Sequence, residues 1–362
     1  MPGIAFGAVS APALADRLAR RTLELVDVRS ESRHEAELAD HVLGVLRDAG
    51  VAARDAGDTC VLAGVTARGD RPLVLLAGHL DTVPAQGNWP GRIEDGRVVG
   101  LGATDMKGAD AVMLELALAG LETTVDVGCV WFGREELPFG DSALTPLLQR
   151  EPGLATADLV IVMEPTANRV QLGCLGNVNA TWTFTGRAGH SARPWLADNA
   201  IHRLAEGVHA LAQVPAGIHD FGGLEYREVV SATTVSGGVA LNVVPGEAVA
   251  QVNYRYPPGL AMEAAEARLH AWCDPYGELA ITGHAPSGPV PQGNALVDAL
   301  VALVGPPEPK QAWTPVAEFG VAGVDAVNFG PGDPALAHTV DEAVGIDALV
   351  RSYEVLAELL CR

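Results

Sequence analysis

The chain contains few cysteines, few basic residues and no long apolar run. Its five cysteines are scattered over 362 residues without a Cys-x-x-Cys pair, which argues against a disulfide framework and predicts reduced thiols in a cytoplasmic protein. Lysine and arginine together number 24 against 45 acidic residues, so the net charge is −21. This acidic balance argues against a nucleic-acid or an anionic-membrane partner.

Apolar residues are plentiful but dispersed. They make up 48% of the sequence, yet no stretch of about 18 of them occurs, so we expect no membrane span. The N-terminus lacks a basic start, so we expect no signal peptide. A chain of 362 residues is long enough for two domains with a sizeable core.

Alternating helix and strand patterns dominate the first part of the chain. Residues 11–50 carry apolar stripes at helical spacing and predict two helices. Continuous apolar runs at residues 73–77, 126–132 and 158–163 are typical of strands buried on both faces, and residues 109–119 predict a helix between the first two. This order predicts an α/β fold with a mostly parallel sheet flanked by helices.

The texture changes near residue 177. Residues 179–185 and 249–256 alternate apolar and polar side chains, as half-exposed antiparallel strands do, and residues 199–213 and 262–272 have helical patterns. Buried-strand character returns at residues 326–329. We therefore expect a smaller α+β domain over residues 177–285, inserted into a main domain formed by residues 1–176 and 286–362.

Histidine and carboxylate side chains follow the predicted buried strands. His79 and Asp81 come directly after the first strand, Glu135 and Glu136 follow the second, and Glu164 follows the third. Functional sites in open α/β sheets lie beyond the carboxyl ends of the strands, so we expect these side chains at one edge. Each motif alone is weak evidence, because a histidine or an acid after a strand is more often an ordinary loop residue.

Two further loops supply the same residue types. Asp105 precedes the helix at residues 109–119, where it is a candidate metal ligand or simply a helix cap. His338 lies beyond a Gly-Pro-Gly-Asp-Pro turn. Of the adjacent pair Glu135 and Glu136, one can bind metal while the other takes a proton from water; the alternative is two solvated surface glutamates. Together these residues form a donor set for two divalent metals that share a carboxylate, which points to hydrolysis.

The order of these motifs resembles the M20 family of di-zinc peptidases and deacylases, and within it the succinyl-diaminopimelate desuccinylases of the actinobacterial type. The likeness covers nearly the whole chain. The motifs that carry it are Gly-His-Leu-Asp-Thr-Val-Pro at residues 78–84, Thr-Asp-Met-Lys at 104–107, Met-Glu-Pro-Thr at 163–166, Gly-His-Ser-Ala-Arg at 189–193, Asn-Val-Val-Pro-Gly-Glu at 242–247, Asn-Tyr-Arg-Tyr at 253–256, Gly-Pro-Gly-Asp at 330–333 and Ala-His-Thr at 337–339.

The resemblance implies two divalent metal ions, zinc first, with cobalt or manganese as alternatives. It also implies a part for each of five ligands: Asp105 bridging the two ions, His79 and Glu164 completing one site, and Glu136 and His338 completing the other.

Other roles also come from the resemblance. Glu135 would be the general base, and Asp81 would orient His79. The inserted domain would form the interface of a homodimer and act as a lid, with His190 reaching the partner subunit's site to stabilise an oxyanion. Asn242 and Arg255 would help to hold substrate carboxylates, since arginine pairs well with such groups.

One segment departs from the family pattern. Desuccinylase-type members resemble one another in a Trp-Thr-Asp-x-Ala-Arg-Phe segment, whereas this chain has Pro315 in place of the aspartate and Glu318 in place of the arginine. A glutamate facing the substrate would repel a carboxylate and favour an amine. The alternative is that Glu318 points elsewhere and the change is neutral.

We therefore expect a cytoplasmic metal-dependent hydrolase of linear amides. The resemblance implies N-succinyl-LL-2,6-diaminopimelate as substrate, cleaved to succinate and LL-diaminopimelate for lysine and peptidoglycan synthesis. Another deacylase or dipeptidase of the family, acting on N-acetylornithine or a similar N-acyl amino acid, is the first alternative, favoured by Glu318. A catalytically inactive binding relative is the second, and the complete set of candidate ligands argues against it.

Overall fold

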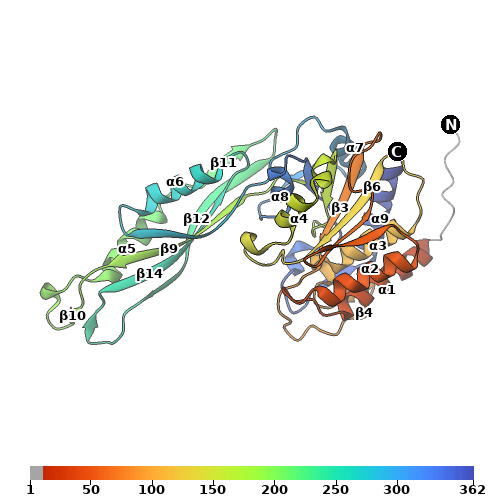
Figure 1. The fold of residues 1–362 in the computed structure, drawn as a ribbon. Helices are drawn as coiled ribbons and strands as arrows, with labels where there is room; N and C mark the ends of the chain where they lie inside the picture. The colour runs from red at the N-terminus through yellow and green to blue at the C-terminus, as the bar shows by residue number, and fades with distance from the viewer. Residues whose placement is uncertain (1–10) are drawn as a thin grey trace. The chain divides into compact units, whose positions relative to one another are not determined.

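The computed structural model describes residues 11–362 and divides the chain into two compact units (Figure 1). The first unit contains the chain up to Gly173 together with Pro291–Glu308 and Thr314–Arg362. The second contains Cys174–Val290 and the short return segment Pro309–Trp313. Nothing in the sequence pattern predicts that this return segment belongs to the second unit, because residues of the first unit precede and follow it.

An eight-stranded sheet forms the centre of the first unit. Its four central strands, β6, β3, β7 and β17, are parallel to one another, and antiparallel strands flank them on both sides. The parallel strands lack polar residues over most of their length because helices cover both faces of the sheet. The order across the sheet is β1 (Ala53–Gly57), β2 (Cys60–Gly64), β6 (Asp126–Phe132), β3 (Leu73–His79), β7 (Leu159–Val162), β17 (Ala326–Asn328), β8 (Gln171–Leu172) and β16 (Glu308–Pro309).

Helices α1, α3 and α9 pack against one another, and α8 packs on β7 and β17. Figure 1 shows α1, α2, α3 and α9 on one side of the sheet and α4 and α8 on the other. The helices of this unit are α1 (Ala11–Asp27), α2 (Ala36–Asp48), α3 (Gly108–Leu118), α4 (Leu144–Arg150), α7 (Ala295–Val304), α8 (Val316–Val321) and α9 (Ile346–Cys361). A small antiparallel sheet adds β4 (Arg92–Glu94), β5 (Arg97–Val99) and β18 (Ala343–Gly345).

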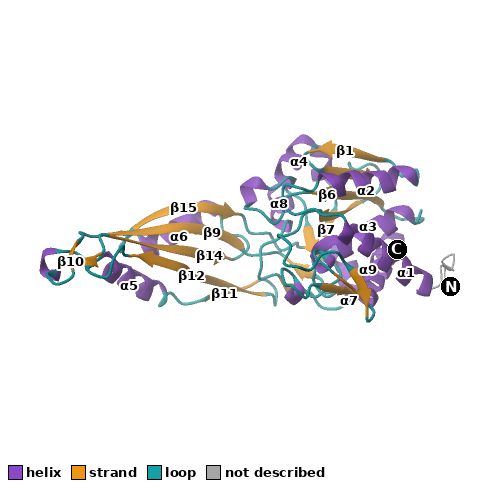
Figure 2. Ribbon diagram, turned by 90° about the horizontal axis from the view of Figure 1, so that it is seen from below, coloured by secondary structure: helices purple, strands orange, loops and turns teal. Residues whose placement is uncertain are grey.

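The second unit is a five-stranded antiparallel sheet with two helices on one face (Figures 1 and 2). Alternate residues of its long strands are buried, and Trp182, Phe184, Tyr254 and Tyr256 lie in the core beneath the helices. The order is β11 (Gly217–Asp220), β12 (Glu225–Gly237), β14 (Glu247–Tyr256), β9 (Gly176–Thr185) and β15 (Glu278–Ala285); the helices are α5 (Ala200–Leu211) and α6 (Met262–Cys273), and a two-stranded ladder joins β10 (Gly189–His190) to β13 (Val243–Val244).

The predicted fold class is confirmed. The runs at residues 73–77, 126–132 and 158–163 are β3, β6 and β7, and the strand and helix patterns of the second unit likewise form β9, β14, α5 and α6. Within residues 11–362, no helix is both long and apolar enough to cross a membrane.

A glycine at the junction of β2 and β6 gives a test of this packing. A Cβ atom added at Gly128 would lie 2.0 Å from the backbone oxygen of Val65, so Gly128→Ala must push the two strands apart. We expect a cost of about 1–3 kcal/mol and a lower thermal midpoint, measured by circular dichroism. Gly44→Ala is the control, because nothing lies within 4 Å of its added Cβ and alanine favours helix α2. A Gly128→Ala midpoint equal to that of the control would contradict the packing.

Candidate metal centre

Three parallel strands place the candidate ligands at one edge of the sheet. β3 pairs with β6 so that His79 is opposite Phe132, and with β7 so that Ala77 is opposite Val162. The chain therefore leaves all three strands at the same edge, which carries His79, Glu135 and Glu164. This arrangement agrees with the rule that sites lie beyond the carboxyl ends of parallel strands.

The carboxylate of Asp105 lies between two histidines. Its Oδ1 is 3.1 Å from Nε2 of His79, and its Oδ2 is 3.5 Å from Nε2 of His338. Nε2 of His338 also lies 2.9 Å from Oε1 of Glu136, and Nε2 of His79 lies 3.9 Å from Oε1 of Glu164. Asp105 thus belongs to two clusters of donor atoms, each within 4.8 Å: one with His79 and Glu164, the other with Glu136 and His338.

The electrostatics of these clusters fit a divalent cation. Burial works against the ionised form of Asp105, but hydrogen bonds from His338 and His79 outweigh it and hold the pKa of Asp105 below its ordinary range. Hydrogen bonds to Asp105 and Glu136 raise the pKa of His338 to about 10. In the metal-free protein, protonated histidine thus supplies the positive charge that the carboxylates require. A metal ion would supply the same charge and release those protons.

Glu135 lies next to these clusters with a different environment. Burial, and then the charge of Glu164, raise its pKa well above that of an ordinary glutamate. A glutamate with a raised pKa suits a group that accepts a proton and returns it. Glu135 also forms a cluster of donor atoms with His79 and Glu136, so geometry alone permits a ligand role as well.

Asp81 holds this part of the site through its backbone and its side chain. Its backbone oxygen is 2.9 Å from Nδ1 of His79, whereas its Oδ1 is 3.6 Å from the same nitrogen. The carboxylate instead accepts hydrogen bonds from the backbone amides of Glu135, at 2.8 Å, and Glu136, at 3.1 Å. Asp81 therefore contacts the His79 ring mainly by its carbonyl group and fixes the Glu135–Glu136 pair by its carboxylate.

Two residues near this site had no signal in the sequence. The hydroxyl of Ser32 donates to Oδ2 of Asp81 at 2.8 Å. The buried carboxylate of Glu35 accepts the amide of Arg134 at 3.1 Å and that of Arg33 at 2.8 Å. Acceptance of backbone amides requires no motif, so neither residue stands out from neighbouring polar residues.

The remaining predicted residues lie elsewhere in the chain. In the second unit, exposed His190 lies opposite Val243 in the β10–β13 ladder; exposed Asn242 directly precedes Val243, and its carbonyl accepts the amide of Ser191 at 3.0 Å. Arg255 lies on β14, and its Nε donates to Asn253 at 3.0 Å. The roles of these three residues stay predictions.

Glu318, at the start of α8 in the first unit, is only 2% exposed. Its oxygens accept hydrogen bonds from Ser142, at 2.9 Å, and Thr145, at 2.5 Å. Both oxygens are therefore engaged within the protein, which favours a packing role for this side chain over contact with a substrate.

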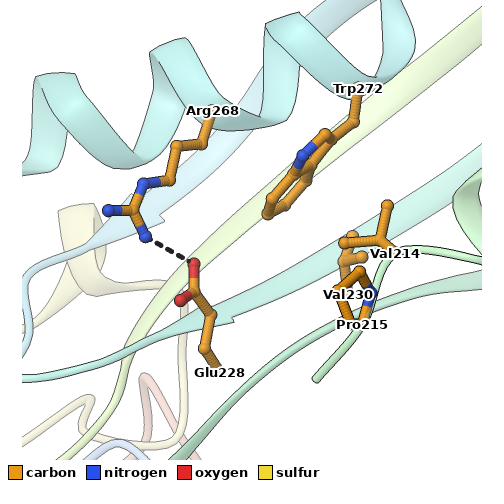
Figure 3. Close-up of a pocket in the computed structure, with 6 residues that line it drawn as sticks. All are labelled: Val214, Pro215, Glu228, Val230, Arg268 and Trp272. Carbon is orange, nitrogen blue, oxygen red and sulfur yellow. Dashed lines mark hydrogen bonds and ion pairs between the residues drawn. The ribbon is translucent and has the colours of Figure 1, made fainter. Parts of the chain in front are cut away.

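The second unit also contains a pocket, between α6, β12 and the segment after α5 (Figure 3). Trp272 faces Val214 and Pro215 across it, and Arg268 points toward Glu228. The carboxylate of Glu228 is already bound by Arg268 at 2.8 Å and by His219 at 2.7 Å. We assign no chemistry to this pocket, because its charged groups neutralise one another.

Residues 75–362 match the model of Peptidase family M20/M25/M40. The chain belongs to this family. It is therefore a metal-dependent amidohydrolase, and its candidate metal ligands converge as such a reaction requires.

Individual relatives align over nearly their whole length. A Mycobacterium tuberculosis protein, named provisionally as a succinyl-diaminopimelate desuccinylase, is 39% identical over 94% of this chain and 96% of its own. An N-acetyl-L-citrulline deacetylase of Xanthomonas campestris pv. campestris is 30% identical over 94% of this chain and 95% of its own. The crystal structure of aminopeptidase PepT from Bacillus cereus has the same fold, with a TM-score of 0.79, 19% identity and coverage of 96% and 98% of the two chains.

Asp105→Asn tests whether the shared carboxylate holds metal. Asparagine keeps the shape but removes the charge that belongs to both clusters, so we expect the purified variant to contain less metal by elemental analysis. Zn²⁺ should also raise its thermal midpoint less than that of the wild type, because stabilisation follows the affinity for the ion. Asp95→Asn, in an exposed turn of the same unit, is the control. Equal metal content in both variants would contradict the assignment.

The buried position of Glu318 gives a pH-dependent prediction. Burial raises its pKa to about 7, above the reference value of 4.5, so ionisation of Glu318 destabilises the fold increasingly between these two pH values. Glu318→Gln cannot ionise. Its stability relative to the wild type should therefore rise from pH 4.5 to pH 7, by on the order of 3 kcal/mol. Thermal unfolding of both metal-free proteins at pH 5 and pH 8 measures this, and a pH-independent difference would contradict it.

Proposed function

We propose that the protein removes the succinyl group from N-succinyl-LL-2,6-diaminopimelate, giving succinate and LL-diaminopimelate for lysine and peptidoglycan synthesis. The observation that carries the proposal is the 39% identity to the provisionally named desuccinylase over 94% of the chain. Two candidate metal-ligand clusters that share Asp105 also support the proposal, because metal ions bound there would assist amide hydrolysis. The small number and wide spacing of the cysteines, with no Cys-x-x-Cys pair, support a cytoplasmic location.

The proposed site holds two divalent metal ions, with zinc as the first choice and cobalt or manganese as alternatives. Histidine nitrogen and carboxylate oxygen are donors that zinc accepts. Bound ions would supply Lewis acidity to the acyl carbonyl and lower the pKa of a water molecule. Asp105 would be shared between the two ions, with His79 and Glu164 as further ligands of one and Glu136 and His338 as further ligands of the other; these residues form two candidate donor clusters.

Glu135 moves the proton in the proposed reaction. It takes a proton from the attacking water, whose oxygen bonds to the acyl carbon, and it returns the proton to the nitrogen as the carbon–nitrogen bond breaks. Asp81 keeps Glu135 in place by accepting its backbone amide at 2.8 Å. In the metal-free protein, burial and the charge of Glu164 raise the pKa of Glu135 above that of an ordinary glutamate.

His190 is the proposed donor to the oxyanion, acting on the site of a partner subunit in a homodimer. Its Nδ1 accepts the amide of Ala192 at 3.1 Å, so in the neutral ring the proton resides on Nε2. Nε2 then remains as a hydrogen-bond donor on an exposed side chain, as an oxyanion requires. Asn242, next to His190, and Arg255 are the proposed partners of substrate carboxylates.

A second candidate is the removal of a different acyl group from another amino acid. The 30% identity to an N-acetyl-L-citrulline deacetylase over a similar length favours it. Glu318 also favours it: if the family's arginine at this position faces a substrate carboxylate, a glutamate there would repel that group. The buried, hydrogen-bonded position of Glu318 weakens the second argument.

The decisive measurement is the release of LL-diaminopimelate from its N-succinyl form by zinc-loaded protein. We expect turnover in the wild type and a loss of at least about 100-fold in Glu135→Gln, which removes the proton acceptor. Glu94→Gln, an exposed acid on β4, is the control and should keep full activity. No turnover by metal-loaded wild type, together with turnover of N-acetyl-L-citrulline or N-acetylornithine, would replace the first candidate with the second.

A further inference from the structure

A buried carboxylate outside the proposed ligand set contacts the backbone of the Asp105 loop. Glu342 is 1% exposed. Its Oε2 accepts the amide of Gly102 at 2.9 Å, and its Oε1 accepts the amides of Thr104 at 3.1 Å and Asp105 at 3.0 Å. One side chain thus binds three amides of a single loop, including that of the proposed shared ligand.

The loop does not satisfy these amides itself. Gly102 has a left-handed φ of 76°, and Asp105 has φ −129° and ψ 91°, outside the helical range. A buried amide without a partner costs free energy comparable to a lost hydrogen bond. The carboxylate of Glu342 therefore stabilises the particular backbone conformation that directs Asp105 toward both histidines.

Glu342 also belongs to the turn that carries His338. Its amide donates to the carbonyl of Thr339 at 3.3 Å, and its own carbonyl accepts the amide of Gly100 at 3.0 Å. His338 has a positive φ of 61°, a conformation that is uncommon for a non-glycine residue. The same residue is thus bound to the Asp105 loop and to the His338 turn.

We infer that Glu342 is a positioning residue that sets the distance between Asp105 and His338, and so the affinity of the cluster that these two residues form with Glu136. The inference rests on the proposed metal site. Removal of a residue that is hydrogen-bonded to a metal ligand commonly lowers metal affinity by about 10- to 100-fold. Glu342 itself contributes no atom to any of the candidate ligand clusters.

The strand that follows Glu342 is held by backbone hydrogen bonds that do not depend on the Glu342 side chain. The next residues, Ala343–Gly345, form β18 and pair with β5 through backbone hydrogen bonds, with Ala343 opposite Val99. These bonds do not involve the carboxylate. Glu342→Ala is therefore expected to fold, while three amides of the Asp105 loop lose the two carboxylate oxygens that accept them.

The test is calorimetric titration of the metal-free, full-length protein with Zn²⁺. We expect Glu342→Ala to bind an ion about 10- to 100-fold more weakly than the wild type. Glu342→Gln should fall between the two, because its oxygen still accepts the amides of Thr104 and Asp105 whereas its NH₂ group faces the amide of Gly102. Asp341→Ala removes an exposed acid from the same turn and should bind as the wild type does.

Wild-type affinity in Glu342→Ala would overturn the inference and leave the proposed metal site standing. If Glu342→Ala does not fold, wild-type affinity in Glu342→Gln would overturn it in the same way. A wild-type protein that binds no Zn²⁺ would overturn both the metal site and the role of Glu342.

Discussion

The crowding of carboxylates at one sheet edge is the constraint on which the site depends. Asp105 and Glu136 lie within 3.5 Å of the same His338 nitrogen, and Glu164 lies within 4 Å of His79. Like charges at such distances repel one another, and burial increases the cost. The cluster is stable only when positive charge lies between the carboxylates, supplied either by protons on the histidines or by metal. A metal ion bound here would therefore compete with the protons on the histidines.

A second set of carboxylates holds the first by a different interaction. Asp81 accepts the amides of Glu135 and Glu136, Glu35 accepts the amide of Arg134, and Glu342 accepts three amides before and at Asp105. Backbone amides bind a carboxylate without carrying a full charge. These acids can therefore lie near the candidate metal site while their oxygens remain engaged with backbone amides. The candidate ligands thus differ from the supporting acids in the atoms that face each carboxylate.

The hydrophobic pattern of the sequence predicted the buried strands and the residues that follow them. Buried parallel strands are recognisable in the sequence as apolar runs. A residue that follows such a run lies at the carboxyl end of the strand, so His79, Glu135 and Glu164 were expected together. Asp105 and His338 come from loops, whose course no periodicity describes, and the family resemblance was needed to include them. Glu342 and Glu35 escaped both approaches, because accepting a backbone amide demands only an oxygen at the right point in space. The same limit explains Pro309–Trp313, which joins the second unit without any change in composition.

Glu318 departs clearly from the family's sequence pattern, yet its contacts in the structure do not indicate a role in substrate binding. A glutamate at a position where the family resemblance implies an arginine suggests a new substrate specificity. However, the hydroxyl groups of Ser142 and Thr145 bind the buried carboxylate of Glu318. A carboxylate so engaged would have to break both bonds before it could meet a substrate amine, at a cost of a few kcal/mol. If the chain binds a dicarboxylate substrate, the positive charge for it must then come from elsewhere. Arg255 is a candidate, because only its Nε is used in the hydrogen bond to Asn253, which leaves the rest of the guanidinium group for an anion.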